Sequence, residues 1–276
     1  MELSWVESLF YGLISGIAEF LPISGEAHRA ILLKLLGAVD DAAIRLAVHF
    51  GALIALIMVN MPTLSKLNRE RRIAAIPPKR RKRQPDMHSL LDLRILKTAC
   101  LPLIVCFILY PVVHDLHQRL WVLALHLIWN GLILYLPQFL PGANKESLSM
   151  SSLDALLIGL GGGTGVFPGI SRVGAAASVG TIRGADRRYI LDISLILCIP
   201  ALIVLSLLDC FSLFTGLGGF TFFAFLRYIT AGISAFSSAY FGIYMIRFLA
   251  VRSGFTGFAY YSWGLALFSF ILYLAI

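Results

Sequence analysis

Long runs of apolar residues, separated by short polar segments, dominate the pattern of this chain. A helix needs roughly 20 apolar residues to cross the hydrocarbon core of a bilayer. Six runs reach or approach that length, namely 42–61, 94–113, 120–140, 189–209, 221–246 and 255–276. The pattern therefore predicts an all-α integral membrane protein with about six full transmembrane spans.

Two further apolar segments, 4–36 and 153–182, are interrupted rather than continuous. Pro and Ser break the first segment at 20–24 and the second at 167–171, 147 residues further along the chain. Irregular backbone at membrane depth occurs only where protein or a wet cavity surrounds it. We therefore expect two re-entrant hairpins, each made from a broken helix, and a function for the breaks themselves.

The two broken segments also match each other residue by residue. At the offset of 147, the identical pairs are Gly16/Gly163, Phe20/Phe167, Ile23/Ile170, Ser24/Ser171, Gly37/Gly184 and Ala38/Ala185. An apolar span follows at the same distance in both halves. Repeat 1 then covers about 4–61 and repeat 2 about 153–209, within a single polytopic membrane domain of residues 1–276. Repeats with broken helices place a binding site near the bilayer midplane.

The positive charge of the chain is concentrated in one segment. Of the 23 Lys and Arg and 15 Asp and Glu, residues 62–99 hold eleven and three, so the rest of the chain is balanced. Because Lys and Arg accumulate in cytoplasmic loops, we interpret 62–93 as a basic cytoplasmic loop. The alternative is a patch that binds nucleic acid or anionic lipid. We expect no nucleic-acid partner. With this loop inside, the two hairpins enter from opposite faces, which is an inverted-topology repeat.

Composition excludes a soluble protein. The chain is 58% hydrophobic and 14% charged, with a mean hydropathy of +0.83. No basic leader precedes the first apolar stretch, so we expect that stretch to belong to the mature fold. The cysteines form no C-x-x-C pair and are expected to be apolar side chains rather than disulfides or metal ligands: Cys100, Cys106, Cys198 and Cys210.

Arg172, directly after the second break, is the strongest candidate for ligand binding. Gly169 lets the backbone approach a ligand closely, and Ser171 is placed to cap the helix that follows. A guanidinium beside free backbone N–H groups forms a cradle for phosphate. The alternatives are an arginine that reaches to the membrane interface, or one that pairs with Glu19.

The first break carries acid and base side chains. Glu19 precedes it and is suited to act as a general base or to hold a divalent cation that bridges phosphates. His28 is suited to act as nucleophile or proton donor; the alternative is a polar residue lining a wet vestibule. Ser24 and Glu26 are candidates for substrate contact, although a carboxylate such as Glu26 also suits the first turn of a helix without any function.

Two other features of the sequence suggest structural roles. The glycine run 161–165 lacks the Gly-Lys-Ser/Thr ending of a nucleotide loop, so we interpret it as close helix packing. Arg45 and Asp192 also lie 147 residues apart, each early in its span. This spacing suggests, as a hypothesis, that the two pair across the symmetry axis of the repeat.

These residues resemble the two signatures of the undecaprenyl-diphosphate phosphatases of the bacitracin-resistance type. The matching segments are 19–24 with His28, and 168–172. The resemblance covers nearly the whole chain and implies an inverted-repeat fold with two re-entrant hairpins. It also implies removal of the terminal phosphate from a C55 polyprenyl diphosphate, dependence on Mg or Ca, and a site at the outer face of the bacterial inner membrane.

Carried over by position, the resemblance assigns catalytic roles to Glu19, His28 and Arg172, with Ser24 and Ser171 at the substrate. The chain departs from the family pattern at Ser15, where the first acid is expected, and at Glu26, within the usual Ser-Ser-Thr-Gly-His run. Glu26 restores a carboxylate from a different position, or else the protein transports a polyprenyl phosphate lipid as a flippase without hydrolysis. The oligomeric state is left open.

Overall fold

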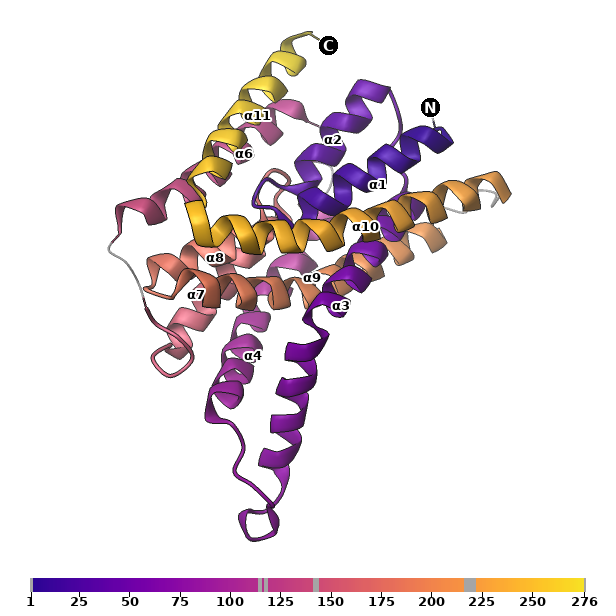
Figure 1. Cartoon of the computed structure of the whole chain (residues 1–276). Helices are drawn as coiled ribbons and strands as arrows, with labels where there is room; N and C mark the ends of the chain where they lie inside the picture. The colour runs from indigo at the N-terminus through magenta and orange to yellow at the C-terminus, as the bar shows by residue number, and fades with distance from the viewer. Residues whose placement is uncertain (1, 114–115, 117–118, 141–143, 216–221, 276) are drawn as a thin grey trace.

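The computed structural model describes residues 2–113, 116, 119–140, 144–215 and 222–275, and this part of the chain is helical without strands (Figure 1). The α-helices are α1 (Trp5–Phe20), α2 (Gly25–Leu36), α3 (Ala42–Ala75), α4 (Met87–Ile108), α5 (Tyr110–Val113), α6 (Leu120–Tyr135), α7 (Ser152–Gly163), α8 (Arg172–Ile182), α9 (Arg187–Thr215), α10 (Phe222–Ser253) and α11 (Thr256–Ala275). Short 3-10 turns cover Pro78–Arg80, Leu136–Phe139 and Thr164–Val166.

Two units of three helices share the same local structure at the predicted offset of 147 residues. Each begins with a capping box, in which a serine hydroxyl and an acidic side chain satisfy the first free N–H groups of the helix. Each breaks, restarts at a serine N-cap, and ends its second helix beside a glycine with positive φ. The paired residues are Ser4/Ser151, Glu7/Asp154, Ser24/Ser171 and Gly37/Gly184. The duplication is therefore present in local structure as well as in sequence.

Five helices of the described residues are long and apolar enough to cross a membrane: α3, α6 with its 3-10 extension, α9, α10 and α11. They correspond to five of the six predicted spans. The sixth, 94–113, differs from the prediction because the helix breaks at Leu109 and α4 carries Asp92, Arg94 and Lys97. The protein is thus a multi-pass membrane protein with broken helices in addition to its spans.

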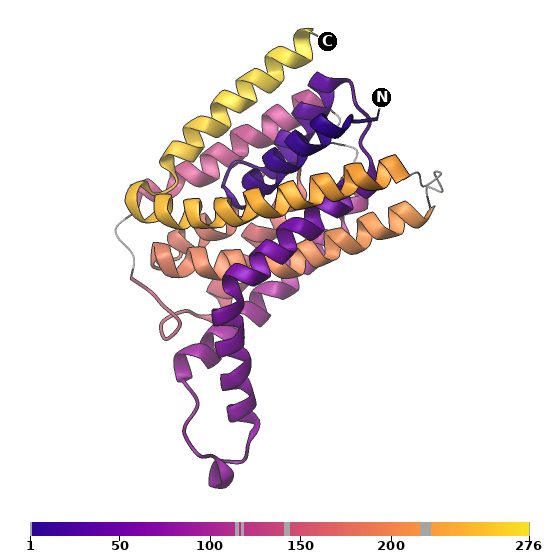
Figure 2. The ribbon, with the colours of Figure 1, turned by 45° about the vertical axis from the view of Figure 1, so that its right-hand side comes forward.

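The predicted basic loop is shorter than 62–93. Helix α3 continues through Pro62 to Ala75, and α4 begins at Met87, so the two helices form a stem that projects from the bundle (Figures 1 and 2). Glu70 organises its tip: the carboxylate binds Arg83 at 2.5 Å and accepts the backbone N–H of Asp86 at 3.0 Å. The run 79–83 is presented at the end of this stem.

Small residues set the closest helix contacts in the bundle. Helix α1 lies against α10, and a side chain at Gly16 would collide with the backbone oxygen of Ala235. Helix α7 lies against α4 in the same way, with Gly159 over Ala99. Close backbone approach at glycine is how helices associate in a bilayer, where apolar burial between helices gains little. The glycine run 161–165 is used similarly, which agrees with the predicted packing role.

Candidate active site

The two helix breaks meet in the interior of the bundle. The Ser24 hydroxyl accepts the backbone N–H of Gly169 at 3.1 Å, and the Ser171 hydroxyl donates to the backbone oxygen of Leu21 at 3.2 Å. Both serines also cap their own helices, Ser24 through Ala27 N–H and Ser171 through Gly174 N–H. One site is therefore built from both halves of the chain, and helices α2 and α8 both begin at it.

Asn130 of α6 joins the two breaks and was missed from the sequence. Its side-chain amide donates to the backbone oxygen of Pro22 at 3.2 Å, and its side-chain oxygen accepts the Ser171 N–H at 2.8 Å. The amide also donates to the hydroxyl of Ser262 on α11. The available signal was a fully buried amide inside an otherwise apolar span, which in a membrane marks a structural or functional contact.

Unusual backbone geometry is concentrated at this junction. Ser24 has φ 66°, and it is the one non-glycine residue with positive φ among those the structure describes. Gly169 has φ 105°, and there a Cβ would press on His126 and on the backbone of α6. Such conformations persist only when surrounding contacts hold them, and they cluster at functional sites.

Glu19 and Arg172 form a buried ion pair beside the breaks. The Nη2 atom of Arg172 contacts Oε1 of Glu19, and the guanidinium lies 5.5 Å from the ring centre of Phe107. Gly165 makes room for the arginine, because a side chain there would overlap Arg172. Of the alternatives considered for Arg172, pairing with Glu19 is the arrangement found, and it brings the acid and the cation together.

Arg29, a residue that the sequence analysis did not select, holds two carboxylates. Its Nη1 atom lies 3.3 Å from Oε2 of Glu19, and its Nη2 atom lies 2.5 Å from Oε1 of Glu26. All three side chains are buried or nearly so. Glu26 is therefore not a solvent-exposed first-turn acid, and its carboxylate belongs to the same cluster as Glu19. Ser15 is buried one turn before Glu19 and donates to the backbone oxygen of Tyr11.

His28 faces a different direction from Glu19. Its Nδ1 lies 2.7 Å from the backbone oxygen of Ser24, and its Nε2 lies 2.8 Å from the hydroxyl of Tyr261. Because a carbonyl oxygen only accepts, Nδ1 carries a hydrogen. His28 is thus held between the backbone of Ser24 and the hydroxyl of Tyr261, and its ring is stacked on Tyr261.

An apolar groove of about 680 Å³ opens beside His28. Helices α1, α10 and α11 contribute most of its walls, and its lining is Ile14, Ile17, Ala18, Leu21, Ile23, His28, Leu249, Gly254, Gly257, Phe258 and Tyr261. His28 and Tyr261 are the residues with polar side chains in this lining. The groove therefore connects an apolar surface to the first break, through Leu21, Ile23 and His28.

The hypothesis that Arg45 pairs with Asp192 is wrong. Arg45 binds Asp40 at 2.6 Å and Asp209 at 3.0 Å, whereas Asp192 binds Arg247 at 2.9 Å. An equal offset in the sequence gave the two residues equivalent places in their helices without bringing them into contact.

The side chains around Glu19 do not by themselves form a divalent-cation site in this arrangement. Both oxygens of Glu19 face guanidinium groups, from Arg172 and Arg29. Within the part of the chain that the structure describes, no three His, Cys, Asp or Glu side chains converge as metal ligands. Hard cations need several oxygen ligands, so these protein groups alone do not supply the set.

Comparison with known proteins matches the chain to one family. The family model described as "Bacitracin resistance protein BacA" matches residues 8–268, nearly the whole chain. The chain belongs to the BacA family. Its breaks, serine caps and Glu19–Arg172 pair all lie inside the matched range.

Curated relatives of this BacA-family chain carry one printed name. The undecaprenyl-diphosphatase of Campylobacter concisus is 34% identical over 215 residues, covering 77% of this chain and 78% of that protein. That of Nocardioides sp. is 31% identical over 204 residues, 72% of each. That of Halothermothrix orenii is 28% identical over 260 residues, 92% of this chain and 93% of the relative.

Proposed function

We propose that this protein hydrolyses a polyprenyl diphosphate, of the undecaprenyl class, to the monophosphate, and so returns the lipid carrier to cell-wall synthesis. The observation that carries the proposal is the buried Glu19–Arg172 pair at the junction of two serine-capped helix starts. The family match and the names of the relatives supply the reaction.

The phosphate-binding step exchanges one anion for another. Arg172 now holds the carboxylate of Glu19, and the diphosphate takes its place on the guanidinium. Ser24 already accepts two backbone N–H groups, which leaves its own O–H to donate to a phosphate oxygen. The starts of α2 and α8 add the favourable field of helix N-termini. The polyprenyl tail lies in the groove beside His28.

Displacement of Arg172 frees Glu19 to act. Glu19 takes a proton from the attacking water, the water oxygen bonds to the terminal phosphorus, and the bond from that phosphorus to the bridging oxygen breaks. Arg172 stabilises the charge that develops on the transferred group. His28, with its Nε2 held by Tyr261, is the alternative attacking group; an acid-labile phosphoenzyme lost in His28→Gln would assign it that role.

Three finer expectations accompany this proposal. The hairpins α1–α2 and α7–α8 are re-entrant and enter from opposite faces as an inverted repeat, the stem tip is cytoplasmic, and the site faces outward in the bacterial inner membrane. A cysteine introduced at Lys82 should react with an impermeant maleimide only from the cytoplasmic side. The Mg or Ca dependence implied by the family stays a prediction, tested by phosphate release before and after chelation.

The decisive experiment measures phosphate release from C55 polyprenyl diphosphate by the purified protein in detergent. We expect wild type to be active and Arg172→Ala and Glu19→Gln to lose about 100-fold or more, as removal of a charge-stabilising group does. Arg80→Ala, at the stem tip, is the matched control and should retain activity. Full activity in both site variants, with wild-type folding, would refute the assignment.

A flippase remains the second candidate, because duplicated units with broken helices are an architecture of transporters. Translocation of a labelled polyprenyl phosphate in vesicles, without phosphate release, would favour it. Phosphate release without translocation would favour the hydrolase.

A further inference from the structure

A chain of buried charges continues beyond the proposed active site. From Arg29 and Glu26 it reaches His49 on α3, whose Nε2 lies 3.9 Å from Oε1 of Glu26. On its other side, Nδ1 of His49 lies 2.7 Å from Oδ2 of Asp209 on α9. Asp209 binds Arg45 at 3.0 Å. Charged side chains from three helices thus line one path through the interior.

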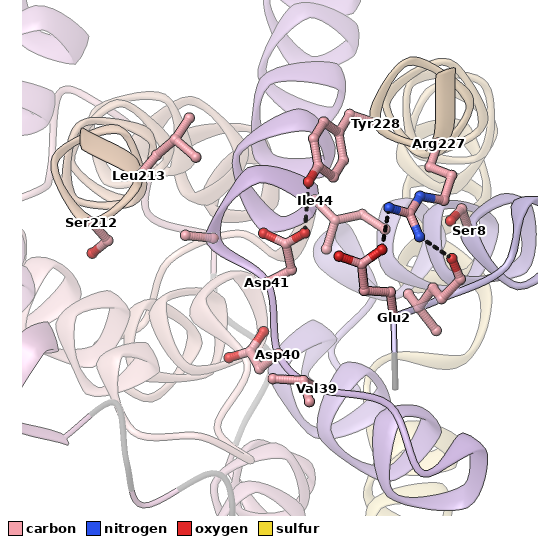
Figure 3. Close-up of a pocket in the computed structure, with 12 residues that line it drawn as sticks. Glu2, Ser8, Val39, Asp40, Asp41, Ile44, Ser212, Leu213, Arg227 and Tyr228 are labelled. Atoms are coloured by element: carbon pink, nitrogen blue, oxygen red, sulfur yellow. Dashed lines mark hydrogen bonds and ion pairs between the residues drawn. The ribbon is translucent and has the colours of Figure 1, made fainter. Parts of the chain in front are cut away.

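The path ends at a pocket of about 290 Å³ on the molecular surface (Figure 3). Arg45 binds Asp40 at 2.6 Å, and Asp40 lines this pocket together with Asp41 and Arg227. The buried chain therefore joins the Glu19 cluster to a place that water reaches.

His49 is the member of the chain suited to carry a proton. It is fully buried, and its Nε2 has no hydrogen-bond partner among the residues that the structure describes. Asp209 is held by Arg45 as a carboxylate, so it accepts, and Nδ1 of His49 carries the hydrogen. The lone pair at Nε2 then faces Glu26. A buried nitrogen without a hydrogen-bond partner costs free energy.

The balance of charge leads to the same residue. The chain holds the carboxylates of Glu19, Glu26, Asp209 and Asp40 and the guanidinium groups of Arg172, Arg29 and Arg45. Four negative and three positive charges leave one negative charge, which stabilises the arriving proton while His49 carries it. The titratable and charged groups around His49 are Glu26 and Arg29 from α2, Asp209 from α9 and Arg45 from its own helix, and the buried Tyr11 and Tyr110 lie near these arginines.

We propose that His49, with Asp209, relays the proton released by hydrolysis from the Glu19–Glu26 cluster to the Asp40 pocket. This inference rests on the proposed phosphatase function. The water proton taken by Glu19 passes to Glu26, which shares Arg29 with it. His49 gains that proton at Nε2 across the 3.9 Å gap, by rotation of Glu26 or through one water, and gives its Nδ1 proton to Asp209. Reorientation of the ring restores the starting tautomer. Asp209 passes the proton to Asp40, which shares Arg45 with it, and Asp40 releases the proton to the pocket.

The test is chemical rescue of phosphate release in His49→Ala. We expect turnover at least about ten-fold below wild type, since positioned proton transfer contributes about 100-fold or more. Added imidazole, which carries protons near neutral pH, should restore the rate. Pyrazole, a ring of the same size that does not take up a proton there, should not. His88→Ala, whose histidine lies in the stem against Ser147, is the matched control and should respond to neither ring.

The outcomes separate the relay from a structural role and from the proposed function. Slow turnover that both rings or neither ring restores would overturn the relay, as would a wild-type rate in His49→Ala. His49→Gln keeps an N–H for Asp209 and guards against misfolding; it should show low kcat, unchanged KM and a rate that rises with buffer concentration. A buffer-independent rate there would also overturn the relay. Wild type without phosphate release would overturn the proposed function, and the relay with it.

Discussion

The side-chain oxygen of Ser24 accepts the backbone N–H of Gly169 at 3.1 Å, although 145 residues separate the two. The bond ties the first helix break to the second and is buried. It satisfies a backbone donor that the irregular turn at Gly169 leaves without a helical partner. Ser24 adopts φ 66° to make it, so local strain and the contact between the two halves are linked.

Ser24 and Ser171 should respond differently to substitution. Ser24→Gly keeps the backbone geometry and leaves the Gly169 N–H unpaired, at a cost of about 1–3 kcal/mol. Ser24→Ala retains the strain of a Cβ at positive φ, which Ser24→Gly relieves, so the Ala variant should be the less stable of the two by about 1 kcal/mol or more. Ser171 is also an N-cap but has φ −82°, so its Ala and Gly variants should differ less than those of Ser24. Thermal unfolding in detergent measures all four, and equal stability of Ser24→Ala and Ser24→Gly would contradict the strain argument.

Filling the groove should weaken the binding of long-chain lipid substrates. A Cβ at Gly257 meets nothing within 4 Å, and Gly257 lines the groove, so Gly257→Phe occupies tail space without disturbing the fold. Each displaced methylene costs about 0.8 kcal/mol, so two of them raise KM for the C55 substrate about ten-fold. Gly264→Phe, on the same helix and equally open, is the control. An equal effect on a short-chain diphosphate would argue against a tail site.

Arg29 should matter more for stability than any exposed arginine. Arg29→Leu leaves Glu26 without its cation and weakens the hold on Glu19, and we expect a loss of about 3–5 kcal/mol. The double variant Glu26→Leu with Arg29→Leu removes both charges and should recover most of that loss, because Glu19 keeps Arg172. Melting temperatures of the two variants, with Arg80→Leu for comparison, check this. No recovery in the double variant would count against it.

The start of α4 in the stem should depend on pH through Asp86. Lys66, at 2.9 Å, and the hydroxyl of Ser89 lower the pKa of this carboxyl from 3.8 to about 2. Since the pKa is lower in the folded state, the stabilisation is present above about pH 4 and is lost as the pH falls towards 2. Amide hydrogen exchange at the start of α4 should be slower in wild type than in Asp86→Asn at pH 6. The two should converge near pH 2, and a constant difference would contradict the expectation.

The sequence could predict the features that depend on neighbouring residues. Serine caps, apolar runs and the breaks at 20–24 and 167–171 act within a turn or two of helix, so their positions could be read from the order of residues. The offset of 147 likewise predicted two units with the same local structure. The apolar pattern failed at 94–113, where Leu109 ends α4 and three charges lie on the helix.

Contacts between distant segments could not be predicted in this way. Arg45 pairs with Asp209 rather than Asp192, and Arg29 bridges Glu19 and Glu26. A buried charge needs an opposite charge, and its partner is the one that helix packing places within about 3–4 Å. Asn130 links the breaks because a buried amide needs hydrogen-bond partners and the packing brings the Pro22 carbonyl and the Ser171 N–H to it.

By itself, then, the sequence determined a membrane class and the positions of two broken apolar segments with matching serine caps. Only the tertiary structure decided that Arg172 rests on Glu19, that His28 faces the groove and that His49 joins the site to a distant pocket. The physical reason is the range of the interactions. Helix caps and hydrophobic periodicity depend on residues close in sequence. The partner of a buried charge depends on how the helices pack, which the order of residues does not specify.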